Sequence, residues 1–160
     1  MKHEVERRFA GHAGFKALRL SYVFSREDRF TQQLQGCANE ARLAEIFDPF
    51  DRAVVHRDDV VLAALALAEP ATWEAALGPV VNVGGPQVLS RVAYAETLRS
   101  RVWPALQVQV VTPPEGFFAN RPRSIAMRSP LLPALLGRAP TTLAEAATLE
   151  FQGLTEVHIG

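Results

Sequence analysis

Residues 80–91 read VVNVGGPQVLSR, and this stretch predicts a buried strand, a tight turn and the start of a helix. Valine favours strands, glycine with proline marks a turn, and Ser90 stands where a helix N-cap belongs. A dinucleotide-binding turn needs three glycines in the order G-x-G-x-x-G, whereas Gly84 and Gly85 are adjacent and no third glycine follows. The stretch is therefore interpreted as a strand-to-helix turn, and no P-loop occurs elsewhere in the sequence.

The segments on either side alternate between strand and helix patterns. This alternation is typical of an α/β fold with a parallel sheet. The first helix has no strand before it, so the chain is expected to begin in the middle of a βα unit. The predicted strands are 15–24, 41–47, 53–56, 79–83 and 106–111, and the predicted helices are 2–12, 29–38, 59–69, 90–102, 129–137 and 142–151.

Composition limits the classes of partner. The 160 residues suit one domain, and 17 basic residues balance 17 acidic ones, which argues against nucleic acid or an anionic membrane as the main partner. The longest apolar run, 60–68, is far shorter than the ~20 residues of a membrane span. Cys37 is the single cysteine, so we expect a core position and a reducing, cytoplasmic setting. The four histidines lack metal-ligand spacing, so no metal site is expected.

The order of several segments resembles the C-terminal half of the extended short-chain dehydrogenase/reductases that act on nucleotide sugars. The most similar branch is the dTDP-4-dehydrorhamnose reductase type, and the resemblance reaches Phe151, whereas 152–160 matches nothing. It implies a partial Rossmann-like parallel sheet with the small substrate-binding region of that family in residues 1–151. The segments that carry it are KALRLSYVFS, DPFDRAVVHRDDVVLAALAL, VVNVGGPQVLSRVAYAETL, RPRSIAM and LLPALLGRAPTTLAEA.

The resemblance implies NAD(P)-dependent chemistry on a nucleotide sugar. In this family a Tyr-x-x-x-Lys helix serves the proton transfer, and the lysine lowers the tyrosine pKa by its charge. MKHEVERRF resembles the part of that helix from the lysine onward, so Lys2 would be the lysine and the tyrosine would precede Met1. The chain is therefore expected to be a truncated reductase or epimerase that is inactive alone and binds no NAD(P) by itself.

The resemblance also nominates substrate-binding residues. Arg52 and Arg121 are the candidates for the diphosphate, because a guanidinium offers two parallel N–H groups to phosphate oxygens. Arg19 and Ser124 are the further candidates for the pocket wall. The alternative is a surface ion pair of Arg52 with Asp48 or Asp51, and an exposed loop position for Arg121.

A second class of function stays open. The same scaffold serves as a non-catalytic binding or regulatory module in proteins of the methionine adenosyltransferase β-subunit type, which resemble these reductases. Under either interpretation, strand edges and helix faces that the missing half would cover are expected to be exposed and to favour aggregation or a homodimer. Asp59, before the apolar helix, is expected to be structural, as an N-cap or a first-turn charge.

Overall fold

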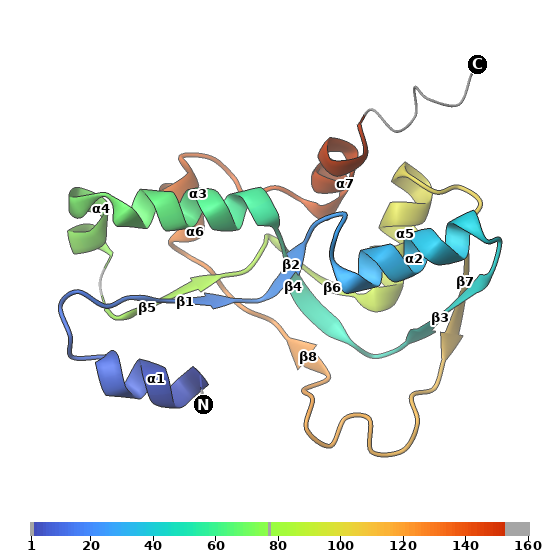
Figure 1. Cartoon of the computed structure of the whole chain (residues 1–160), viewed down its shortest axis with the longest axis horizontal. Coiled ribbons are helices and arrows are strands. Elements are labelled where there is room, and N and C mark those ends of the chain that lie inside the picture. Colours follow the sequence, from blue (N-terminus) through green and yellow to red (C-terminus); the bar gives the residue numbers. More distant parts are fainter. Residues whose placement is uncertain (1, 77, 153–160) are drawn as a thin grey trace.

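The computed structural model describes residues 2–76 and 78–152. Its strands and helices alternate along much of the chain, as the sequence predicts (Figure 1). In chain order the elements are α1 (Lys2–Phe9), β1 (Ala17–Leu20), β2 (Tyr22–Phe24), α2 (Arg29–Asn39), β3 (Leu43–Phe47), β4 (Asp51–His56), α3 (Arg57–Ala68), α4 (Pro70–Ala75), β5 (Val80–Val83), β6 (Gln87–Ser90), α5 (Arg91–Arg101), β7 (Gln107–Val111), β8 (Ser124–Ile125), α6 (Leu132–Leu136) and α7 (Leu143–Phe151).

Most strand pairs are parallel, which confirms the predicted α/β class. Within the described residues β1 pairs with β5, β3 pairs with β7, and β4 lies between β2 and β6 with β8 also paired to it. The β4–β6 pair is antiparallel, and the others are parallel. The predicted strand 15–24 is in fact two strands with a break at Ser21. The break occurs because β1 pairs with β5, whereas β2 pairs with β4. One extended segment thus contributes to two sheets.

The glycine pair in the quoted stretch packs against β4. A Cβ atom added to Gly85 would lie 1.6 Å from the Val54 carbonyl oxygen, so only glycine fits there. A Cβ on Gly84 would meet the Ala53 and Met127 side chains at 3.2 and 3.3 Å. This close approach lets the chain turn into β6, an additional strand that the sequence pattern did not predict. The two glycines therefore serve strand packing.

The core of the described residues divides between two ends of the molecule (Figure 1). At one end α2, α5 and α7 bury Phe24, Leu34 and Leu98 against the sheets, and at the other α3 and α6 bury Val55 and Val81. Burial of such side chains contributes ~1.5–3 kcal/mol each, so these clusters dominate the stability of the fold. Cys37 is buried in the first cluster, as predicted.

Side chains cap several helix starts, among them Ser90, which the sequence predicts as an N-cap. The Asp28 carboxylate accepts from the backbone of α2, Ser90 Oγ accepts from the Ala93 N–H, and Thr142 with Glu145 forms a capping box at α7. Pro70 follows the predicted helix 59–69 and starts a further helix, α4, in which the first residue needs no backbone N–H.

Asp59 is structural, but it does not cap α3. The N-cap of α3 is His56, which makes no side-chain capping bond. The buried Asp59 carboxylate instead accepts from the Thr141 backbone N–H at 2.7 Å and from Arg138 Nη2 at 2.6 Å. It therefore fixes the segment before α7 against the first turn of α3.

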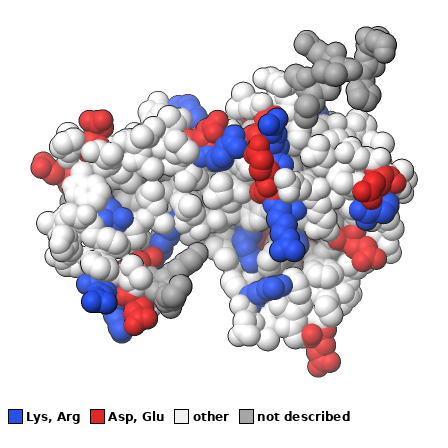
Figure 2. Space-filling view, viewed as in Figure 1, with Lys and Arg blue, Asp and Glu red and all other residues white. Residues whose placement is uncertain are grey.

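Apolar side chains are exposed on strand edges and helix faces, as expected. Leu65 on α3 is 61% exposed and Leu20 on β1 is 44% exposed. On the face drawn in Figure 2, basic and acidic groups are interspersed, in agreement with the balanced composition. No helix in the described ranges is long and apolar enough to cross a membrane.

Candidate anion-binding site

Two arginines line one hollow of the molecule, and two more lie in the loop to which one of them is hydrogen-bonded. Arg52 lies on β4, Arg91 is the first residue of α5, and Arg121 and Arg123 lie in the connection between β7 and β8. Within residues 2–76 and 78–152, none of these four guanidinium groups forms an ion pair with a carboxylate. Other arginines do form such pairs, namely Arg19, Arg26, Arg42, Arg57, Arg99 and Arg138.

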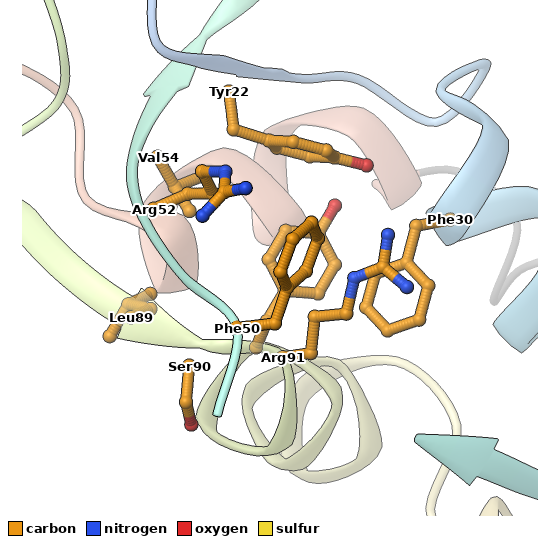
Figure 3. A pocket seen from close by; sticks show the side chains of 9 residues that line it. Tyr22, Phe30, Phe50, Arg52, Val54, Leu89, Ser90 and Arg91 are labelled. Carbon is orange, nitrogen blue, oxygen red and sulfur yellow. The ribbon is translucent and has the colours of Figure 1, made fainter. Parts of the chain in front are cut away.

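Aromatic rings hold these guanidinium groups in place. The Phe50 ring lies between two of them, with the Cζ of Arg52 at 3.9 Å and that of Arg91 at 4.4 Å from its centroid (Figure 3). Arg91 also lies 4.6 Å from the centroid of Phe30. In the neighbouring loop Arg121 and Arg123 cover Phe117 and Phe118 at 4.8 and 4.4 Å. Stacking on a ring face leaves the N–H edges of a guanidinium free for other partners.

Arg52 differs from Arg91 because its N–H groups have partners. Its Nη1 donates to the carbonyl oxygens of Asp51 at 2.5 Å and Arg123 at 3.3 Å, and its Nη2 donates to Pro122 at 3.0 Å. Backbone pairing joins the same two segments, since Asp51 of β4 pairs with Ser124 of β8. Arg52 thus fastens the loop that carries Arg121 and Arg123 to β4.

The hollow itself is small, with about 20 Å³ of space for the centre of a water molecule, and it measures about 250 Å³ when its open mouth is counted. Tyr22 and Tyr94 line it, and both donate their hydroxyls to Asp28, at 2.5 and 3.0 Å. Burial and the bond to Asp28 raise the pKa of Tyr22, and burial with the Asp28 charge raises that of Tyr94. Both phenols therefore stay protonated at neutral pH and form a fixed wall. The lining residues are Tyr22, Phe30, Phe50, Arg52, Val54, Leu89, Ser90, Arg91 and Tyr94 (Figure 3).

The arginines of the hollow repel one another. Burial, then the positive charge of Arg91, lowers the pKa of the Arg52 guanidinium. Burial is also the largest cause that lowers the pKa of Arg91, and Arg121 lowers it further. A guanidinium nevertheless stays charged at physiological pH. The charges of Asp28 and Asp51 act in the opposite direction, on Arg91 and Arg52 respectively, but they offset the lowering only in part, so the site favours an anionic ligand.

The predicted site residues fall into different places. Arg52 lines the hollow and makes no ion pair with Asp48 or Asp51 in the described part of the chain. Arg121 is exposed in the β7–β8 connection and does not line the hollow, which is the alternative position considered for it. Arg19 does not line the hollow. Its guanidinium instead forms an ion pair with Glu6 of α1, in which Nη2 donates to Oε2 at 2.6 Å. Ser124 is exposed on β8 and does not line the hollow.

Some predictions concern residues whose side chains lie outside the described part of the chain. Lys2 begins α1, but its side chain lies outside the described part, as do His158 and the tail beyond Gln152. No group of three metal-ligating side chains lies together among the described residues.

Arg91 was missed by the sequence analysis. Arg91 directly follows the Ser90 cap and ends the quoted stretch, so its position at a helix start could be predicted from the sequence. Its nearness to Arg121 could not be predicted, because the two residues are distant in sequence and only the tertiary structure brings them close.

Solved structures resemble the chain along almost all of its length. UDP-glucuronic acid 4-epimerase from Bacillus cereus, with UDP-glucuronic acid and NAD bound, has a TM-score of 0.68 and 19% identity; the match covers 98% of this chain and 49% of that one. UDP-glucose 4-epimerase from Thermotoga maritima, with UDP-glucose, has a TM-score of 0.66 and 20% identity, covering 96% and 51%. dTDP-glucose 4,6-dehydratase from Bacillus anthracis, with NAD, has a TM-score of 0.64 and 16% identity, covering 88% and 44%.

No protein-family model matches the chain, and no curated protein matches it in sequence. The structural similarities establish the fold: the chain has the Rossmann-like α/β architecture found in these nucleotide-sugar epimerases and dehydratases. It spans about half the length of the solved chains that it matches.

Proposed function

We propose that residues 1–151 are the C-terminal, sugar-nucleotide-binding part of an NAD(P)-dependent oxidoreductase or epimerase of the dTDP-4-dehydrorhamnose reductase type. The observation that carries the proposal is that Arg52 and Arg91 line an aromatic-walled hollow and form no ion pair with a carboxylate in the described residues, while Arg121 covers Phe117, whose ring centroid lies 6.1 Å from that of Phe50. Such a site suits the diphosphate of a nucleotide sugar, because guanidinium groups bind phosphate oxygens through paired N–H donors. The fold shared with nucleotide-sugar enzymes supports the same substrate class.

The described residues do not fit a dinucleotide cofactor at the glycine turn. The Val54 carbonyl already occupies the space beside Gly85 that a pyrophosphate would need. In this proposal NAD(P) belongs to the complete enzyme, and the described residues bind the substrate. Lys2, at the start of α1, is proposed as the lysine partner of a tyrosine outside this chain.

Isothermal titration calorimetry tests the proposal. UDP-glucose and dTDP-glucose are titrated into the chain and compared with UMP, which lacks the diphosphate. We expect both nucleotide sugars to bind at least about tenfold more tightly than UMP, because only they offer phosphates to several arginines. Equal affinity for UMP and the nucleotide sugars, or no binding of any of them, contradicts the proposal.

Arg101→Gln is the matched control. Arg101 is an exposed arginine in the last turn of α5, the same helix that Arg91 begins, and it does not line the hollow. This variant removes one positive charge from the chain without touching the site, so we expect it to bind nucleotide sugars as the unaltered chain does. A loss of affinity in this variant would show that net charge, and not the site, drives binding.

A further inference from the structure

Arg52 and Arg91 share the Phe50 ring but differ in what their donors do. Three hydrogen bonds join Arg52 to the carbonyl oxygens of Asp51, Pro122 and Arg123. Carbonyl oxygens are good partners for a guanidinium, and a ligand phosphate would have to displace them. Arg52 is thus committed to holding the loop in the structure as it stands.

Arg91, unlike Arg52, donates no hydrogen bond from its guanidinium to any of the described residues. It lies against the ring faces of Phe50 and Phe30, at 4.4 and 4.6 Å from their centroids. The ring faces stabilise its positive charge in part through cation–π attraction, but they offer no hydrogen-bond acceptor to its in-plane N–H groups. The Asp28 carboxylate nearby is already occupied by the hydroxyls of Tyr22 and Tyr94 and by the backbone of α2.

We infer that Arg91 is the principal contact for the ligand's phosphates and that Arg52 is a positioning residue, which fixes the loop bearing Arg121. The inference deepens the proposed function and rests on it for the identity of the ligand. It assigns Arg91 a role that neither the motif pattern nor the resemblance gives it. The cations that remain for the diphosphate are then Arg91 at the start of α5 and, in the β7–β8 connection, Arg121 with Arg123. Arg91 lies against Phe50, whose ring centroid is 6.1 Å from that of Phe117 beneath Arg121.

The experiment compares Arg91→Gln, Arg91→Lys and Arg52→Gln in the full chain, with Arg101→Gln as the control. UDP-glucose and inorganic pyrophosphate are the probes, and calorimetry is run at several salt concentrations. Arg91→Gln should weaken binding of both probes by at least about tenfold and make it less sensitive to salt, because a charged contact is lost. Arg91→Lys should restore part of the affinity, since it keeps the charge but not the planar fork.

Arg52→Gln should behave differently. It should weaken binding less than Arg91→Gln, keep the salt sensitivity of the unaltered chain, and speed amide hydrogen exchange of Arg123 and Ser124, because the loop loses its anchor. Thermal melts establish that each variant is folded.

The outcomes separate the two claims. If Arg52→Gln removes binding and its salt sensitivity while Arg91→Gln changes neither, the inference is overturned and the proposed function stands. If pyrophosphate binds through Arg91 but UDP-glucose binds no better than UMP, the anion contact is supported and the proposed function fails. If the unaltered chain binds neither probe, both are overturned.

Discussion

The imidazole Nε2 of His56 lies 3.0 Å from the Glu150 Oε1, and both side chains are almost entirely buried. The bond joins the end of β4 to α7, the last described helix. Arg57 also reaches Glu150 from the start of α3, at 3.2 Å. Because β4 carries both His56 and Arg52, this contact fixes the strand that positions the arginine hollow.

Removing the Glu150 carboxylate should destabilise the fold. Glu150→Ala leaves the buried His56 ring nitrogen without its partner, and a buried polar group left unsatisfied costs about 1–3 kcal/mol. Urea denaturation followed by circular dichroism measures the free energy of unfolding. Glu96→Ala, which breaks the exposed pair of Glu96 with Arg99, is the control and should cost well under about 1 kcal/mol. Equal losses in the two variants would contradict the account.

The two glycines Gly85 and Gly36 should respond to alanine in opposite directions. Gly85→Ala places a Cβ against the Val54 carbonyl oxygen, at 1.6 Å, so β4 and β6 must separate and the fold should be severely destabilised. Gly36→Ala lies inside α2, where the added Cβ meets no atom within 4 Å apart from its chain neighbours and the backbone of its own helix, and it should stabilise the protein by about 0.5–1 kcal/mol. Thermal melts of both variants decide the matter. A soluble Gly85→Ala protein with an unchanged melting temperature would show that the β4–β6 approach is wrong.

The capping box of α7 should make stability depend on pH. The Thr142 backbone N–H and then its hydroxyl lower the pKa of Glu145 below its ordinary value of 4.5. A lowered folded-state pKa means that the contribution is present above pH 4.5 and is lost as pH falls through the folded pKa. Glu145→Gln should therefore be less stable than the unaltered chain at neutral pH. The difference in stability between the two proteins should become smaller in acid. Denaturation midpoints across this pH range provide the test, and a gap that widens in acid would refute the assignment.

Local signals in the sequence predicted much of the fold. Asp28, Ser90 and Thr142 lie next to the backbone groups that they cap, so a few neighbouring residues suffice to identify them. The short strands β6 and β8 were missed because each exists only through pairing with β4, which is distant in sequence. The break at Ser21 was missed for the same reason, since it reflects a change of partner strand.

The candidate site was predictable only in part. Arg52 and Arg121 came from a resemblance of motifs. Arg91 can be identified only from the fold, which places it against Phe50, 6.1 Å from the Phe117 ring that Arg121 covers. Arg19 shows the converse: the resemblance placed it in the pocket wall, but α1 supplies Glu6 as its partner. Sequence patterns identify residue types suited to phosphate, but the tertiary structure decides which guanidinium groups remain free to bind it.

The most direct measurement is a crystal structure of the chain with UDP-glucose bound. The account predicts that the diphosphate lies between Arg91 and Arg121, with guanidinium nitrogens about 2.7–2.9 Å from its oxygens, while Arg52 keeps its bonds to the loop carbonyls. A diphosphate bound elsewhere, with both of those arginines directed into solvent, would contradict it.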